Sequence, residues 1–193
     1  MAGKRLSKRR SSRFSSPFSR WWSDLRFYWH TRDKTPLIVV SLVSLGIAAI
    51  GFLMYSMSAL ASERREVTCL AMNVYYEARG EQLAGQYAVA EVTMNRVASA
   101  RYPGTVCEVV YQKRWDPLRK RYVSAFSWTE FDLVPHPYGE PWQQAWEVAK
   151  AVYEGQQPPT VNGALLYHAR YIKPSWSRGK RPVARVGAHI FYR

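Results

Sequence analysis

One uncharged segment restricts the folds open to this chain more than any other feature. No Asp, Glu, Lys or Arg occurs from Thr35 to Ser62, and the 21 residues Leu37–Met57 within this segment are nearly all apolar. As a helix they would be about 31 Å long at roughly 1.5 Å per residue, which is close to the thickness of one bilayer core. A run that is apolar on all sides does not suit the amphipathic helix of a soluble domain. We therefore expect a single transmembrane helix over residues 37–60.

The charge distribution predicts how this helix is oriented. The chain has a net charge of +14, and residues 1–36 carry ten Lys/Arg against two Asp, a local excess of +8. Basic residues before an apolar span stay in the cytoplasm, so we expect a cytoplasmic tail over 1–36 and a domain over 63–193 outside the inner (cytoplasmic) membrane. Aromatic residues interleave with the basic ones, which suits a segment lying on an anionic leaflet, although a disordered topology signal fits equally well. Because the positive charge is densest in the tail, we do not expect the domain to bind nucleic acid.

The end of the apolar segment leaves one alternative open. Ala59, Leu60 and Ala61 form an A-x-A pattern, after which a signal peptidase could cut. The apolar run is longer than the usual ~7–15 residues of a signal peptide, and the basic region before it is also long. These two features favour an uncleaved signal anchor.

The remainder of the chain predicts a mostly helical α+β domain. Periodic apolar residues and terminal signals indicate helices over 63–78 and 83–98, a short helix after the capping box of Thr105 and Glu108, and a helix from Pro141 to Gly155. Short strands are expected at 164–168, 183–186 and 188–192. Residues 112–140 read as a long polar and aromatic connection.

Glu77 is the first candidate for chemistry. It lies where the helix over 63–78 meets Arg79 and Gly80, among small and aromatic residues. A carboxyl held against such surfaces resists ionising and can donate a proton near neutral pH. The competing interpretation is an ordinary glutamate at a helix end, paired with Arg79 or Arg96. Ordinary glycoside hydrolysis needs a second carboxylate, and neither Glu81 nor Glu91 is clearly placed to supply it.

The histidines and cysteines do not predict a metal site. His136, His168 and His189 match no ligand spacing, so we expect no metal and no cofactor. Cys69 and Cys107 would lie on the oxidising side of the membrane. A disulfide between them and two separate buried thiols are both open.

Aromatic residues recur in the connection and in the C-terminal part. Those interleaved with Ser, Lys, Arg and Pro suit a surface that stacks on flat, amphipathic ligands such as sugars, while some must belong to the core. The residues concerned are Trp115, Phe126, Trp128, Tyr167, Tyr171 and Trp176.

These segments together resemble the SleB-type cell wall hydrolase family, whose best-known members are spore-cortex-lytic enzymes. The match runs from about Cys69 to Arg193. It rests on several blocks in the family's order: YYEARGEQLAGQYAVAEVTMNRV, YPGTVCEVVYQ, FSWT, YHARYIKPSW and VGAHIFYR. The chain departs from many members at His168, where they have Tyr-Tyr-Asn-Pro in place of Tyr-His-Ala-Arg.

The resemblance implies a lysozyme-like catalytic domain that acts on peptidoglycan glycan strands. The family's catalytic glutamate falls on Glu77, and relatives of the spore enzymes are lytic transglycosylases that form 1,6-anhydro-N-acetylmuramic acid. Hydrolysis of the same bond, and a catalytically silent tether between membrane and wall, are the alternatives. With this function we expect the substrate-binding residues to be Glu81, Gln86, Phe126, Trp128, Tyr167, His168 and Trp176.

Overall fold

The computed structural model describes residues 21–22, 24–27, 33–117, 119–131 and 133–193. The chain divides into two compact units, Met1–Tyr55 and Ser56–Arg193, and each is described by itself. Most of the predicted basic tail lies outside the described residues. Residues 21–22 and 24–27 are helical, and the rings of Trp21 and Trp22 stack at 5.9 Å.

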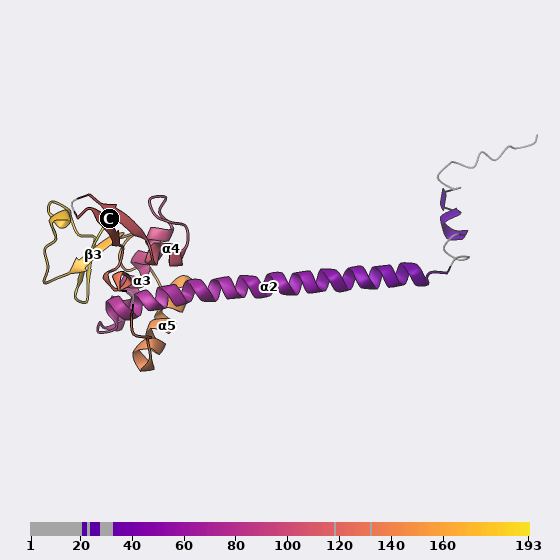
Figure 1. Ribbon diagram of the computed structural model, residues 1–193, viewed down its shortest axis with the longest axis horizontal. Coiled ribbons are helices and arrows are strands. Elements are labelled where there is room, and N and C mark those ends of the chain that lie inside the picture. The colour runs from indigo at the N-terminus through magenta and orange to yellow at the C-terminus, as the bar shows by residue number, and fades with distance from the viewer. Residues whose placement is uncertain (1–20, 23, 28–32, 118, 132) are drawn as a thin grey trace, which may run out of the picture. The chain divides into compact units, whose positions relative to one another are not determined.

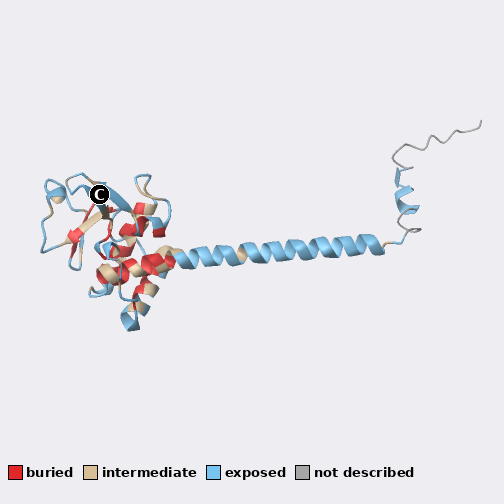
Figure 2. Ribbon diagram, in the orientation of Figure 1, coloured by how far each residue is buried: buried red, intermediate tan, exposed pale blue. Residues whose placement is uncertain are grey.

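Helix α2 (Thr35–Ala78) is a single continuous helix. Asp33 caps its first turn by accepting hydrogen bonds from the backbone N–H and the hydroxyl of Thr35, at 3.0 and 2.6 Å. The sequence predicted separate helices over 37–60 and 63–78, but no Gly or Pro lies between Phe52 and Ala78 to interrupt the helix. In Figure 2 the residues of its first part are coloured as exposed and many of those near its end as buried. Among the described residues, α2 alone is long and apolar enough to cross a membrane.

The main core of the second unit lies where three further helices meet the end of α2 (Figure 1). These are α3 (Leu83–Val97), α4 (Val106–Val110) and α5 (Gly139–Tyr153). Eight of the twelve residues 67–78 of α2 are buried here, and Val67, Leu70 and Val74 form one stripe at helical spacing within them. The remaining buried members come from all three helices and from the 126–128 segment, and include Ala90, Val106, Val110, Phe126, Trp128, Ala145 and Val148.

The short helix α4 is attached to α2 at its N-terminus. Thr105 caps it through the Glu108 N–H, as its sequence pattern predicts. The Glu66 carboxylate, from α2, accepts the backbone N–H groups of Val106 and Cys107. A disulfide joins Cys69 to Cys107, which decides between the two alternatives that the sequence left open.

A three-stranded antiparallel sheet closes the C-terminal part of the chain. Its order is β3 (Leu166–Ala169), β5 (His189–Tyr192), β4 (Ala184–Val186), with Tyr167 opposite Phe191. Phe191 forms a second core cluster with Ala88 and Val92 of α3. These strands agree with the sequence prediction to within two residues, and the short helix η2 (Ser175–Ser177) lies in the connection before β4.

The connection 112–140 contains secondary structure that the sequence did not predict. Strands β1 (Lys113–Asp116) and β2 (Arg121–Ser124) pair as an antiparallel hairpin, followed by the 3-10 helix η1 (Ser127–Glu130). The strands are short and mostly exposed. They therefore show no alternation of apolar and polar residues, which is the usual signal for a strand.

Candidate active site around Glu77

Glu77 lies in the last turn of α2, one residue before the helix ends at Ala78. The chain turns sharply after it, since the Glu81 N–H donates to the Ala78 carbonyl at 2.9 Å. The flanking Tyr75 and Ala78 belong to the buried surface of the helix, while the Glu77 side chain is half-buried. The helix end is thus fixed by the core, and this fixes the backbone of Glu77.

The Glu77 carboxylate accepts a hydrogen bond from the hydroxyl of Tyr167, on strand β3, at 3.1 Å. Burial raises the pKa of Glu77 above its ordinary value, and the Tyr167 hydrogen bond and the charge of Arg96 partly oppose this rise. Burial, with the Glu77 charge next, raises the pKa of Tyr167 well above its ordinary value, so Tyr167 remains a donor at neutral pH. The site therefore combines a carboxyl whose pKa is raised with a fixed donor for its carboxylate form.

The competing interpretation of Glu77 as half of a helix-end ion pair does not fit the contacts. Arg79 lies over the ring of Tyr75, at 5.1 Å from its centroid. Arg96 donates to the Leu165 carbonyl at 2.9 Å, and its guanidinium lies over the rings of Tyr102 and Phe126. Within the described part of the chain, no ion pair joins either arginine to Glu77.

Glu81 fastens the start of α3 to the β4–β5 turn. Its carboxylate accepts the Ala188 N–H at 2.9 Å and lies 3.8 Å from Nδ1 of His189. It packs against Gly85 and Gly187: a Cβ atom at Gly187 would collide with it, and one at Gly85 would be in tight contact with it. Because this carboxylate is engaged within the protein, we no longer expect Glu81 to bind substrate.

His189 connects the Glu81 contact to Glu77 by way of Tyr167. The His189 ring meets the edge of Tyr167 at 5.3 Å between centroids, and Tyr167 holds Glu77. Burial lowers the pKa of His189, while the Glu81 charge acts in the opposite direction. Gly187 and His189 lie in the VGAHIFYR block, but the sequence assigns neither of them a role. The pattern that could have indicated one is a glycine between two predicted strands, followed two residues later by a histidine.

Four predicted substrate-binding residues are buried instead. Gln86, Phe126, Trp128 and His168 expose 1, 4, 7 and 7% of their surface, so these four side chains lie in the protein interior and have little surface with which to contact a substrate. These residue types suit a ligand site as well as a core, and a linear pattern does not distinguish the two.

Each of these buried groups has a packing role. Trp128 donates its indole N–H to Asn73 at 3.1 Å and stacks on Tyr76. Asn73 lies one turn before Glu77 on the same helix, so this contact also fixes the helix end. His168 lies 3.0 Å from the hydroxyl of Tyr192, whose ring it stacks against.

Two predicted contacts, Tyr167 and Trp176, stay compatible with a ligand. Tyr167 presents its hydroxyl to Glu77, and Trp176 is 39% exposed while its inner edge packs on His168 and Tyr192. Within the described residues, no group of three His, Cys, Asp or Glu side chains lies together as a metal site would require.

Comparisons with known proteins identify the fold. The sequence profile of the cell wall hydrolase family matches residues 80–192, which begins three residues after Glu77. The chain is 29% identical over 130 residues to a spore cortex-lytic enzyme of Bacillus cereus and 32% identical over 126 residues to that of Bacillus subtilis. These alignments cover 66 and 65% of this chain but only 44 and 37% of the relatives, so the chain spans less than half of their length.

Solved structures agree with this match. The catalytic domain of the Bacillus cereus SleB protein superimposes with a TM-score of 0.53 at 29% identity, over 67% of this chain and 91% of that domain. The catalytic domain of the germination-specific lytic transglycosylase SleB from Bacillus anthracis gives a TM-score of 0.52, also at 29% identity. The chain therefore belongs to the cell wall hydrolase family and carries the fold of the SleB catalytic domain, mostly helical with small sheets.

Proposed function

We propose that this protein is a membrane-anchored lytic transglycosylase that cleaves peptidoglycan between N-acetylmuramic acid and N-acetylglucosamine. The observation that carries the proposal is the environment of Glu77: a half-buried carboxyl with a raised pKa, hydrogen-bonded by the partly buried Tyr167. Family membership supports peptidoglycan as the substrate, and a solved relative is named as a lytic transglycosylase.

In the proposed reaction Glu77 acts first as an acid and then as a base. Its proton passes to the glycosidic oxygen as the bond from that oxygen to C1 of the muramic residue breaks. The C6 hydroxyl of the same muramic residue attacks C1, and the Glu77 carboxylate accepts the proton of that hydroxyl. The products are a 1,6-anhydro-muramic end and a free C4 hydroxyl on N-acetylglucosamine, and no water is consumed. One carboxyl can do both steps when its pKa lies near the working pH.

The engagement of the neighbouring acids supports this route over ordinary hydrolysis. Glu81 is bound to the Ala188 N–H, and Glu91 accepts the N–H groups of Thr160 and Val161 and the Thr160 hydroxyl. A hydrolase of the usual kind needs a second carboxylate that is free to activate water or attack C1. The transglycosylase needs only Glu77.

Anchoring by the first part of α2 completes the proposal. The apolar stretch Leu37–Met57 is exposed along its length and follows a strongly basic tail. An inner-membrane span with a cytoplasmic N-terminus would place Glu77 on the wall side, within reach of glycan strands. Residues 63–193 are then the catalytic domain.

The test is digestion of purified peptidoglycan by the full chain in detergent, with the released fragments identified by mass spectrometry. Anhydro-muramic ends are the expected products. Reducing muramic ends would show hydrolysis and overturn the transglycosylase mechanism. No release of muropeptides by the wild-type protein would overturn the enzymatic proposal and leave a binding tether.

A further inference from the structure

The β1–β2 hairpin carries a concentration of positive charge that the proposed catalysis does not use. Its twelve residues, 113–124, contain five Lys/Arg and one acid, Asp116. The net charge is +4, and among the described residues of the hairpin all five Lys/Arg are exposed. A field this dense attracts anionic ligands.

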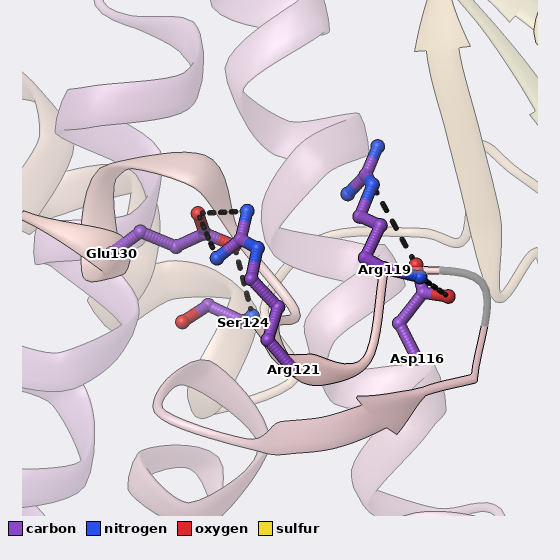
Figure 3. Close-up of polar contacts among 5 residues, drawn as sticks. All are labelled: Asp116, Arg119, Arg121, Ser124 and Glu130. Carbon is purple, nitrogen blue, oxygen red and sulfur yellow. Dashed lines mark hydrogen bonds and ion pairs between the residues drawn. The ribbon is translucent and has the colours of Figure 1, made fainter.

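Ion pairs within and beside the hairpin hold it in one shape (Figure 3). The Arg121 guanidinium donates through both terminal nitrogens to Glu130, at 3.3 Å each, and Glu130 also accepts the Ser124 N–H at 3.2 Å. At the turn, Asp116 accepts the Arg119 N–H at 3.1 Å and lies 3.6 Å from its Nε. The nearby acids are therefore engaged by Arg119 and Arg121.

Three basic side chains of the hairpin are exposed to solvent. Lys113, Arg114 and Lys120 are exposed, and among the residues that the structure describes no ion pair engages them. Their charge is thus balanced by none of the described acids, so it is available to an external ligand.

An exposed aromatic pair lies on the same hairpin. Trp115 and Tyr122 are directly opposite each other, so both project from one face, with ring centroids 5.4 Å apart. They are 56 and 63% exposed, and Lys113, two residues from Trp115, shares their face. Aromatic surface beside a cation suits a ligand that alternates sugar rings with carboxylates.

We infer that the β1–β2 hairpin is a second contact with peptidoglycan, at which Lys113, Arg114 and Lys120 bind carboxylates of the stem peptides while Trp115 and Tyr122 pack on adjacent sugar. The inference rests on the proposed function, because peptidoglycan supplies both chemistries along one strand. A membrane surface fits less well. Lipid headgroups supply anionic groups but no sugar rings for Trp115 and Tyr122 to pack on, so a membrane surface is kept as an outcome of the test.

The experiment measures binding without cleavage, so that it does not depend on catalysis. The full chain carrying Glu77→Gln is sedimented in detergent with insoluble peptidoglycan, either intact or stripped of stem peptides by an amidase. Adding Lys113→Gln, Arg114→Gln and Lys120→Gln should weaken binding to intact peptidoglycan roughly tenfold, flatten its salt dependence, and leave binding to stripped glycan unchanged.

Two controls separate lost charge from lost structure. Replacing the exposed Arg64, Arg101 and Lys150 by Gln removes the same charge elsewhere and should leave binding within about twofold. Lys113→Arg with Lys120→Arg keeps the hairpin charge and should bind like the parent.

Several results would overturn the inference. One is that the triple variant of Lys113, Arg114 and Lys120 binds as tightly as its parent. Another is that the control variant of Arg64, Arg101 and Lys150 loses as much binding. The third is that phosphatidylglycerol vesicles, but not soluble muropeptides, compete for binding. The last would assign the hairpin to the membrane. If the proposed function itself were wrong, the wild-type protein would release no muropeptides. The binding experiment does not depend on that result, so the two failures can be told apart.

Discussion

The protonation of Glu77 depends on a balance between burial and one hydrogen bond. Burial favours the neutral acid, and the Tyr167 hydroxyl at 3.1 Å favours the carboxylate. A general acid is active only while protonated, so cleavage should decline as the pH rises through the pKa of Glu77.

Tyr167→Phe tests this balance. Removing the hydroxyl withdraws stabilisation from the carboxylate, so the pKa of Glu77 should rise further and the alkaline limb of the pH–rate profile should move to higher pH. The maximal rate should fall about tenfold, because the carboxylate loses its positioning donor when it acts as a base. The check is muropeptide release measured across pH. A limb that stays in place or moves to lower pH would contradict the assignment.

Gly187 offers a test of the Glu81 contact with a matched control in the same chain. Gly187 and Gly179 both have a positive φ, of 55° and 78°, but only at Gly187 would a Cβ meet Glu81. Gly179→Ala should cost about 1 kcal/mol of unfolding free energy from backbone strain alone. Gly187→Ala should cost more and should also reduce activity, because it displaces the carboxylate beside His189.

Denaturant unfolding and muropeptide release of both glycine variants supply the measurement. Equal costs in stability, with activity kept in both, would show that the Glu81 contact does not position the site.

At the scale of elements, α4 depends on α2 for its attachment. The Cys69–Cys107 disulfide and the Glu66 carboxylate join the two helices at the start of α4. Replacing both cysteines by Ala should lower the unfolding free energy by about 2–4 kcal/mol, since the bond closes a long loop in the unfolded chain. Urea denaturation of the oxidised wild type, the reduced wild type and the double variant measures this. A double variant as stable as the oxidised wild type would be the contradicting result.

The elements that the sequence predicted are those with strong local signals. The periodic apolar residues of 83–98 and the capping box at Thr105 identify α3 and α4 because local interactions decide them. The β1–β2 hairpin was not predicted because its strands show no alternation of apolar and polar residues and Pro117 lies between them. Its shape depends on Glu130, nine residues from its Arg121 partner, and such pairings are not visible in a linear pattern.

The candidate site divides in the same way. Glu77 was predictable because small and aromatic residues surround it in the sequence. Its hydrogen-bond partner Tyr167 lies 90 residues away in the sequence, so a local pattern cannot reveal the contact. The position of Tyr167 beside His189 likewise depends on the pairing of β3 with β5. The burial of Phe126 and Trp128 was unpredictable for a related reason: an aromatic residue in a connection has the same sequence pattern whether it faces the core or a ligand.

At the scale of the whole molecule, the proposed topology carries a prediction of its own. Alkaline phosphatase fused after Arg193 should be active, since that enzyme folds only outside the cytoplasm, whereas a fusion after Lys34, before the apolar segment, should be inactive. The measurement is phosphatase activity per fused molecule in intact cells. An inactive fusion after Arg193, with the protein present at normal levels, would contradict the outward orientation.

The account rests on Glu77 as the single acid and base, and one comparison tests this most directly. The full chains of the wild type, Glu77→Gln and Glu147→Gln are incubated with purified peptidoglycan, and the rate of anhydro-muropeptide release is measured. Glu147 is an exposed residue of α5, so its variant controls for the loss of one carboxylate. Glu77→Gln keeps the shape of the side chain but cannot release a proton, so we predict a loss of roughly 10²–10⁴-fold while Glu147→Gln stays near the wild-type rate. A Glu77→Gln variant that releases anhydro-muropeptides at the wild-type rate would contradict the account.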